Sequence, residues 1–260
     1  MEYRSLGRTG LTTSALGWGT VKLGRNIDVK YPASFDLPSD QEACDIVLAM
    51  LDLGITLIDT APAYGLSESR LGIALANRRQ EVVLSSKVGE QFQDGRSHFD
   101  FTGAAARRSV EASLRRLGTD HLDILLIHSD GRDEWIQRET DLIETLKSIK
   151  AEGKTRAIGL SGKTPEGAGL ALAWADVLMC PWHPLDRSHE SVMASARSTG
   201  LGVLAKKVLA SGHAADPQSA LKESMSHADA AVIGSLSPTR MHANCGVLES
   251  PESEPRLGDH

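Results

Sequence analysis

The chain alternates short apolar runs with stretches of helical periodicity, and this alternation limits the folds open to it more than any other feature. The runs are rich in Val, Ile and Leu, and most are apolar on both faces, as is typical of parallel strands buried on both sides. Repeated strand–helix units of this kind build parallel α/β folds. Eight runs are predicted as strands: Ala15–Thr20, Ile55–Asp59, Val82–Lys87, Asp123–His128, Arg156–Ser161, Val177–Pro181, Gly202–Lys206 and Ala231–Ser235.

Helix start and stop signals lie between these strands. Ser39 and Asp40 precede a helix predicted over Glu42–Leu53, and Thr102 precedes one predicted over Ala104–Leu117. A third helix is predicted over Asp133–Glu152, because Gly153 follows its last periodic residue. Eight strand–helix units in 260 residues predict an α/β fold of the (β/α)8 TIM-barrel class, occupying residues 1–260 as a single domain.

Three segments fall outside this repeat. Tyr3–Ser14 holds two short extended pieces around a glycine turn, which predicts an N-terminal β-hairpin closing the barrel floor. Val21–Pro38 is a long loop after the first strand, and we expect it to lie over the active face. The last residues, about 249–260, are rich in proline and charge, and we expect a flexible tail there.

Charge and composition exclude several classes of partner. The net charge is −6, and no basic run is long enough to track phosphates, so we expect neither nucleic acid nor membrane as a partner. The three cysteines form no CxxC pair, so no metal site is predicted. No signal segment and no apolar run near the ~18 residues of a membrane helix occur, which favours a cytoplasmic protein acting on a small molecule. Nothing in the sequence indicates the oligomeric state.

Three successive strands end in residues that can carry chemistry. They end in Asp59, Lys87 and His128, and Tyr64 follows shortly after the first of them. Catalytic side chains of such barrels project from the carboxyl ends of strands, so these four would meet at one mouth. A phenol has a pKa near ~10, and a neighbouring ammonium stabilises the phenolate. Together they predict a proton donor, with the carboxylate holding the ammonium and the imidazole orienting a substrate oxygen.

Each of these residues also has a purely structural interpretation. Asp59 and the threonine after it could cap the next helix, since Asp and Thr are favoured cap residues. His128 alone could be a hydrogen-bonded core histidine, and Tyr64 could simply pack in its loop. Lys87 resists such an interpretation best, because a lysine rarely closes a buried apolar strand without a role or a partner.

At these residues the sequence resembles the aldo-keto reductases, and the resemblance runs from Tyr3 to about Leu248. It implies Tyr64 as general acid, Lys87 and Asp59 as its charge partners, and His128 beside the carbonyl. The segments that carry it are Tyr3-Arg4-Ser5-Leu6-Gly7-Arg8-Thr9-Gly10-Leu11, Gly54-Ile55-Thr56-Leu57-Ile58-Asp59-Thr60-Ala61-Pro62-Ala63-Tyr64-Gly65, Ser85-Ser86-Lys87-Val88-Gly89 and Leu122-Asp123-Ile124-Leu125-Leu126-Ile127-His128.

The resemblance also implies NADPH, lying across the barrel mouth, and a small carbonyl compound as substrate. A serine, helix-start amides and an arginine after the last strand suit a phosphate. The expected cofactor contacts are Ser161, Met179, Lys206, Lys207, Leu209, Gly234, Ser235, Arg240 and Asn244. The expected substrate pocket consists of Trp18, Tyr31, Phe35 and Trp182.

The sequence departs from the family mainly where the nicotinamide would lie. Gly162 stands where an asparagine is usual, Met179 where a glutamine is usual, and Lys206 where an aromatic residue often stacks on the ring. Gly234 replaces a lysine near the adenosine phosphate. We therefore expect weak cofactor binding, or a ring held by Trp182 and other groups. Restoring the two amides at positions 162 and 179 is predicted to tighten binding.

Two other functions fit the same residues. Lys87 could be a Schiff-base nucleophile in an aldolase-like barrel, with the nearby acid groups handling protons. Alternatively, the chain could be a barrel that binds NADPH as a redox sensor or regulatory subunit with little turnover, which the altered nicotinamide contacts favour.

Overall fold

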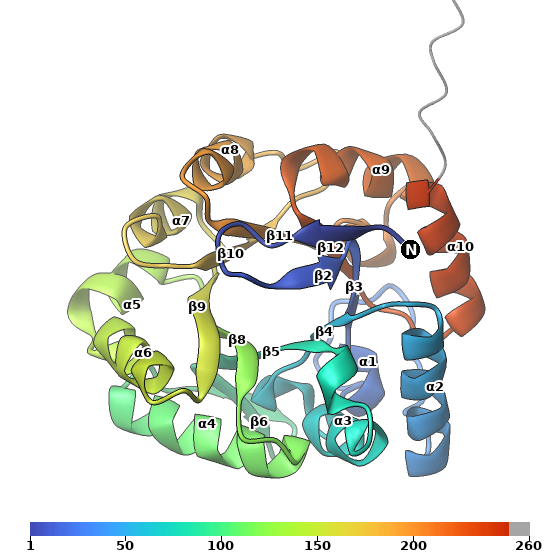
Figure 1. Ribbon diagram of the computed structural model, residues 1–260, viewed down its shortest axis with the longest axis horizontal. Coiled ribbons are helices and arrows are strands. Elements are labelled where there is room, and N and C mark those ends of the chain that lie inside the picture. The colour runs from blue at the N-terminus through green and yellow to red at the C-terminus, as the bar shows by residue number, and fades with distance from the viewer. Residues whose placement is uncertain (250–260) are drawn as a thin grey trace, which may run out of the picture.

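The computed structural model describes residues 1–249, and its centre is a closed barrel of eight parallel strands surrounded by helices (Figure 1). Neighbouring strands follow the order β10-β11-β12-β3-β4-β5-β8-β9 around the barrel. Each strand predicted from the sequence overlaps one of them, so the TIM-barrel prediction is confirmed. The barrel strands are β3 (Leu16–Gly19), β4 (Leu57–Asp59), β5 (Val83–Val88), β8 (Leu122–His128), β9 (Thr155–Ser161), β10 (Val177–Pro181), β11 (Gly202–Lys206) and β12 (Ala230–Ile233).

Helices follow the strands and pack on the outside of the barrel. The α-helices are α1 (Val21–Gly24), α2 (Asp40–Asp52), α3 (Ser67–Leu75), α4 (Gly103–Leu117), α5 (Asp133–Glu139), α6 (Leu142–Ala151), α7 (Pro165–Ala171), α8 (Glu190–Ser198), α9 (Pro217–His227) and α10 (Pro238–Glu249). Short 3-10 turns are η1 (Pro62–Tyr64), η2 (Arg79–Glu81) and η3 (Ala210–Gly212). The tail expected at 249–260 lies, from residue 250 on, outside the described residues.

The single helix predicted over Asp133–Glu152 is wrong, because the chain breaks between α5 and α6. Thr140 donates its hydroxyl to the carbonyl of Ile136 at 2.6 Å, and the Asp141 carboxylate accepts the amide of Gly103 at 2.7 Å. A hydroxyl that bonds the carbonyl four residues earlier competes with the helical hydrogen bonds, and α5 ends just before Thr140. Asp141, held by its contact with α4, lies between the two helices.

Alternation along each strand decides which side chains fill the barrel. Residues two apart point to the same face, so one set faces the interior and the other faces the helices. The interior set is mostly apolar, with Ser85 as a buried polar member. Its apolar members are Leu57, Val83, Ile124, Leu126, Ala157, Val177, Met179, Leu204, Ala230 and Val232, with Leu6 and Leu11 from the N-terminal hairpin.

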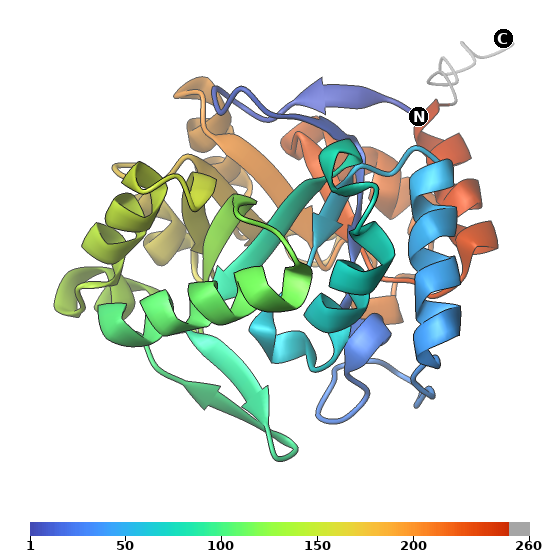
Figure 2. The ribbon, with the colours of Figure 1, turned by 60° about the horizontal axis from the view of Figure 1, so that its bottom comes forward.

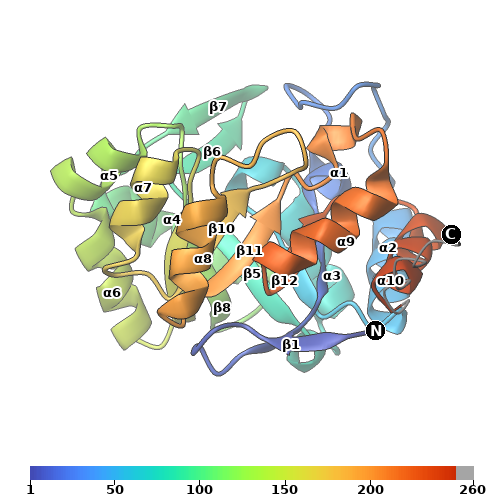
Figure 3. The same cartoon turned by 90° about the horizontal axis from the view of Figure 1, so that it is seen from above.

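Two hairpins lie at opposite ends of the barrel (Figures 2 and 3). The N-terminal pair β1 (Tyr3–Ser5) and β2 (Thr12–Ser14) closes the floor, as predicted. The pair β6 (Glu90–Gln93) and β7 (Arg96–Phe99) extends β5 at the other end, beside the long loop after α1. This second hairpin was not predicted. Among residues 1–249, no helix is long and apolar enough to cross a membrane.

Candidate active site

Strand alternation brings the three chemistry-bearing strand ends to one layer at the open end of the barrel. Leu57 faces the interior, so Asp59, two residues on, faces the mouth. By the same count Val83 places Lys87 there, and Leu126 places His128 there. The structure therefore brings together the residues that the sequence places at successive strand ends.

Lys87 is the centre of this layer, and its ammonium is fully enclosed. Its side chain is 1% exposed. Nζ donates to both carboxylate oxygens of Asp59 at 2.7 Å and to the carbonyl of Thr60 at 2.9 Å. Ser85 also donates to Asp59 at 3.0 Å, and Asp59 caps no helix. The carboxylate thus offsets the desolvation of the ammonium, and the capping interpretation of Asp59 is wrong.

Tyr64 lies at the end of η1, where its hydroxyl is 3.2 Å from Lys87 Nζ. Arg25 holds the turn by donating to the carbonyl of Ala63 at 3.0 Å. The backbone after Tyr64 also packs directly against Gly24, where a side chain would collide with it. Gly65 turns there with a φ of 59°, a conformation that favours glycine. The phenol is thereby held over the ammonium.

The phenol keeps its proton in this environment. Burial raises the pKa of Tyr64 well above its ordinary value, and the negative charge of Asp59 raises it further. We expected Lys87 to lower this pKa, but its charge is largely balanced by the carboxylate it contacts. Tyr64 is therefore a neutral hydrogen-bond donor at neutral pH.

His128 stands between the phenol and a carboxylate that the sequence reasoning missed. The rings of His128 and Tyr64 meet edge to face, with centroids 6.0 Å apart. On its other side, His128 Nδ1 lies 3.0 Å from Oε2 of Glu90, the first residue of β6. Burial lowers the pKa of His128, while the contact with Glu90 works against this shift. The Asp94-Gly95 pair between polar, alternating residues is the signal that could have revealed this hairpin.

The opposite side of the mouth has fewer charged and hydrogen-bonding side chains. Lys206, at the end of β11, donates to the Ser161 hydroxyl at 2.8 Å. Burial lowers the pKa of Lys206 to about 7, and the charge of Lys207 lowers it further. In the loop after β11, Lys207 has a φ of 60° and Ser211 a φ of 58°, a left-handed conformation uncommon outside glycine. Leu209 lies between them and packs against the core.

At the two positions where the family's amides are missing, the neighbouring side chains explain the loss. A Cβ on Gly162 would lie 2.8 Å from Oδ2 of Asp133. That oxygen already accepts hydrogen bonds from the backbone amides of Lys163 at 2.7 Å and Thr164 at 2.8 Å. Met179 is 1% exposed and lies in the apolar interior one layer below the mouth. An asparagine at position 162 would have to displace Asp133, and a glutamine at position 179 would bury its amide among apolar side chains. Both observations count against the expected gain, which stays a prediction.

The segment after β12 carries the expected phosphate contacts. Ser235 accepts the backbone amide of Ser237 at 3.0 Å, just before α10 begins. Arg240 is exposed, and Asn244 follows it by one helical turn, so both lie on the same face of α10. Burial lowers the pKa of Lys22, and the nearby charge of Arg240 lowers it further. Lys22 is a second cation that the sequence reasoning missed.

Tyr31 lies close to the glycine at position 234. Its hydroxyl would lie 3.2 Å from a Cβ placed there, so the long loop reaches across the end of β12. The Lys22 ammonium lies 4.2 Å from the centre of the Tyr31 ring and 5.1 Å from that of Phe35. Two of the four expected pocket residues, Tyr31 and Phe35, thus lie on the loop at the active end.

The other two expected pocket residues, Trp18 and Trp182, do not line the mouth. Both are fully buried among the side chains that pack between the barrel and its helices. The Trp18 indole donates to the carbonyl of Ser235 at 2.8 Å. Trp182 stacks on His227 and donates to Glu190. Strand alternation turns both side chains outward, so the expectation that Trp182 holds the nicotinamide ring is wrong as well.

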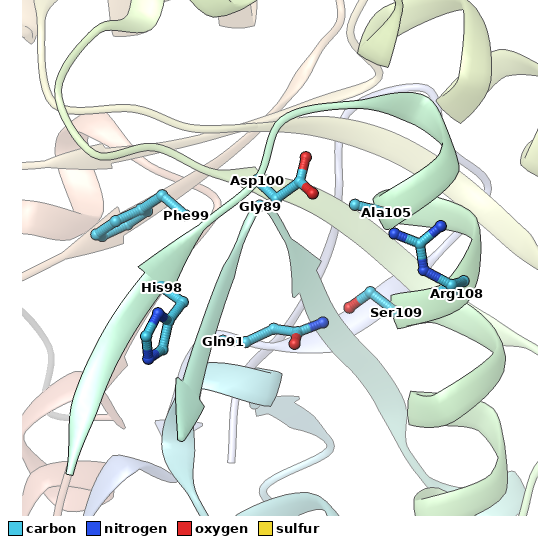
Figure 4. A pocket seen from close by; sticks show the side chains of 8 residues that line it. All are labelled: Gly89, Gln91, His98, Phe99, Asp100, Ala105, Arg108 and Ser109. Atoms are coloured by element: carbon cyan, nitrogen blue, oxygen red, sulfur yellow. The ribbon is translucent and has the colours of Figure 1, made fainter. Parts of the chain in front are cut away.

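A cleft on the outer side of the β6–β7 hairpin is separate from these residues. It lies between the hairpin and α4 (Figure 4) and contains none of the four residues of the mouth. Its lining residues are Gly89, Gln91, His98, Phe99, Asp100, Ala105, Arg108 and Ser109.

Comparison with known proteins agrees with this arrangement. L-galactose dehydrogenase from Arabidopsis thaliana is 32% identical, with 87% of this chain and 75% of that protein covered. An NADH-specific methylglyoxal reductase from Escherichia coli is 32% identical, over 78% of this chain and 66% of that protein. The chain spans 75%, 61% and 56% of the first three curated relatives.

A solved structure from Pseudomonas aeruginosa, described as a candidate aldo-keto reductase, superimposes with a TM-score of 0.86. It is 42% identical, and 95% of this chain and 93% of that one are covered. The model of the aldo/keto reductase family matches residues 15–250. The barrel, the mouth and these matches together place the chain in the aldo/keto reductase family, whose members are oxidoreductases acting on carbonyl and alcohol groups.

Proposed function

We propose that the protein reduces an aldehyde or ketone to an alcohol with NADPH, and that Tyr64 is the general acid. The contact between the Tyr64 hydroxyl and the enclosed Lys87–Asp59 pair carries this proposal. Members of the family use nicotinamide cofactors, and the bound cofactor supplies a hydride to the carbonyl carbon. The residues of the mouth then have to bind the carbonyl oxygen and deliver one proton to it.

These tasks divide among the four residues. Tyr64 holds its proton and donates it to the oxygen as negative charge develops there. Lys87 lies beside the phenol oxygen and stabilises the phenolate left behind. Asp59 keeps Lys87 charged and in place, and His128 orients the carbonyl oxygen from the side. Proton return from solvent restores Tyr64 for the next turnover.

The residues present fit NADPH better at its phosphate end than at its ring. Lys22 and Arg240 are close enough for their repulsion to lower the pKa of Lys22, so a phosphate between them would be favourable. The start of α10 and Ser235 add hydrogen-bond donors nearby. At the ring end, the hydroxyl of Ser161 and the amine of Lys206 would replace the usual amides. A relative named as NADH-specific makes the choice of cofactor a question for experiment.

The Schiff-base alternative is disfavoured by the contacts of Lys87. An imine requires a neutral, free amine, whereas Lys87 donates to the Asp59 carboxylate and to a carbonyl. The sensor alternative is supported only by the sparse ring end of the site.

One experiment separates these functions. NADPH and NADH are titrated by fluorescence, and turnover is then measured over a panel of aldehydes and ketones. Tyr64→Phe should lower the reduction rate by ~100- to 10,000-fold with nearly unchanged NADPH affinity. Tight binding of NADPH without turnover would favour the sensor. Retention of most activity in the variant would exclude Tyr64 as the donor.

A further inference from the structure

Glu90 is a charged residue at the barrel mouth that the proposed reaction leaves without a role. Its side chain is 12% exposed. Oε2 lies 3.0 Å from His128 Nδ1, while Oε1 accepts the Ser97 hydroxyl at 2.6 Å and lies 3.6 Å from Arg25. The residue thus joins the β6–β7 hairpin, the long loop after α1 and the end of β8.

The surroundings of His128 decide which ring nitrogen can meet a substrate. Nδ1 is shut off from solvent, and within residues 1–249 no group is aligned with it for a regular hydrogen bond. The Glu90 carboxylate is the charge beside it. The Tyr64 ring meets the imidazole edge to face. With Nδ1 turned to Glu90, Nε2 is the nitrogen left for the mouth.

Building on the function proposed above, we propose that Glu90 is a positioning residue that keeps a proton on Nδ1 of His128 and turns Nε2 toward the reacting oxygen. When the imidazole is neutral, Nε2 then offers a lone pair, which suits an alcohol hydroxyl. When it is protonated, Nε2 offers a proton, which suits a carbonyl oxygen. Glu90 thereby sets which direction of the reaction His128 supports at a given pH.

The proton balance follows from these two forms. In reduction, protonated His128 donates a hydrogen bond to the carbonyl oxygen while Tyr64 transfers the proton. In oxidation, little Tyr64 is available as a base, because its raised pKa leaves almost none of it ionised. Neutral His128 then accepts the hydroxyl proton at Nε2, while the C–H electron pair passes as hydride to the oxidised nicotinamide and the carbonyl forms.

Several charged groups face His128, and Glu90 is the one that favours its protonation. Lys87 on β5 and Lys206 on β11 both lower the pKa of His128, as does burial. Tyr64 on η1 is a neutral phenol. Burial alone would raise the pKa of Glu90, but the contacts with His128, Ser97 and Arg25 together lower it to about 2, so this carboxylate is ionised throughout the working range.

Glu90→Gln tests the proposal, because it keeps the size of the side chain and removes its charge. The pKa of His128, followed by NMR in the protein without cofactor or substrate, should fall by about one unit or more. The pH above which carbonyl reduction declines should fall by the same amount, so kcat/KM for reduction near that pH drops ~10-fold while alcohol oxidation is kept. Asp94→Asn removes a charge from the tip of the same hairpin and should shift neither.

The tautomer of wild-type His128 gives a second readout that needs no variant. At a pH above its titration, ¹⁵N NMR should show the proton on Nδ1. A proton on Nε2 would overturn the proposal, as would an unchanged His128 pKa and pH profile in a folded Glu90→Gln. Because both NMR measurements are independent of turnover, a wild-type protein without reductase activity would count against the proposed function and not against the pairing.

Discussion

Around the barrel mouth, the ends of β4, β5 and β8 carry charged groups that contact one another, whereas the ends of β9 to β12 carry few. On the first side, Lys87 donates to Asp59 and lies beside Tyr64, and Glu90 lies beside His128. On the second side, Lys206 has the Ser161 hydroxyl as its hydrogen-bond partner. We call the first side the complete side, because its charged groups have partners within the protein. We call the second side the sparse side, because its cations lack such charged partners among residues 1–249.

This difference indicates how the proposed chemistry is divided. A group that moves a proton has to be held in place before the substrate arrives, so its partners belong to the protein. Cations that hold an anionic cofactor bind it better when no carboxylate of the protein neutralises them, because the ligand then supplies the opposite charge. Lys206, with a pKa of about 7, is a cation of this kind. So are Lys22 and Arg240, which lie near each other.

Removing one charge from the complete side should give the largest effect. Lys87→Met is expected to lower carbonyl reduction by ~100- to 10,000-fold. Asp59→Asn should lower activity too, and it should lower the free energy of unfolding by about 3–5 kcal/mol, since it leaves a buried ammonium unpaired. The double variant Asp59→Leu with Lys87→Met should regain stability but not activity. Unfolding curves and rates check this, and a double variant as unstable as Asp59→Asn would contradict it.

On the sparse side, Lys206 should behave as an unusually reactive amine. With a pKa of about 7 it is half neutral at pH 7, whereas an ordinary lysine has a pKa of ~10.4 and is almost wholly charged. The neutral fraction of Lys206 at pH 7 is then ~1,000-fold that of an ordinary lysine. Because Lys206 is half-buried, we expect an amine-reactive reagent to label it ~100-fold faster than the exposed Lys147. Mass spectrometry of peptides over pH 5–9 measures both rates. Parallel pH dependence of the two residues would mean that Lys206 is charged in the mouth.

The sequence predicts the complete side better than the sparse one, for a physical reason. Buried parallel strands are apolar on both faces, so their ends are easy to locate, and the residues there can be read off directly. Asp59, Lys87 and His128 were found in this way. Glu90 was missed because β6 is short, polar and half exposed, and Lys22 was missed because only the folded loop brings it near Arg240.

The sequence indicates where a strand ends, but it does not show how much room surrounds a side chain. The sequence suggests that Gly162 has merely lost an amide side chain, yet the Asp133 carboxylate lies where such a side chain would begin. Trp182 looked like a ring contact, yet alternation turns it outward onto His227. Both cases concern what surrounds a residue and not where its strand ends.

Gly162→Asn tests whether an amide side chain is missing from the sparse side because there is no room for it. The added Cβ would lie 2.8 Å from Asp133 Oδ2, so the carboxylate that holds the start of the next segment would have to move. We expect the free energy of unfolding to fall by about 1–3 kcal/mol, as for other overpacked sites. Gly169→Asn is the control, because a Cβ there meets nothing within 4 Å. Unchanged stability together with tighter NADPH binding would instead support the original expectation.

The last prediction concerns the two cations near α10. NADPH and NADH differ only by the 2′-phosphate of the adenosine, so groups near that phosphate have to account for any preference. Arg240→Ala should weaken NADPH binding by about tenfold, since a charge-assisted hydrogen bond contributes about 1.5–3 kcal/mol and 1.4 kcal/mol is one factor of ten. NADH binding should change little. Lys22→Met should act in the same direction, because Lys22 is the second cation near that phosphate.

Salt separates this explanation from a structural one. If both cations meet the phosphate, the NADPH preference should shrink as ionic strength rises, because partly exposed charges are screened. Lys222→Met, on the exposed part of α9, removes a cation of the same kind and should leave both affinities unchanged. Equal losses for NADPH and NADH in Arg240→Ala would instead assign Arg240 to the adenine or to the fold. The sparse side would then recognise the cofactor without reading its 2′-phosphate.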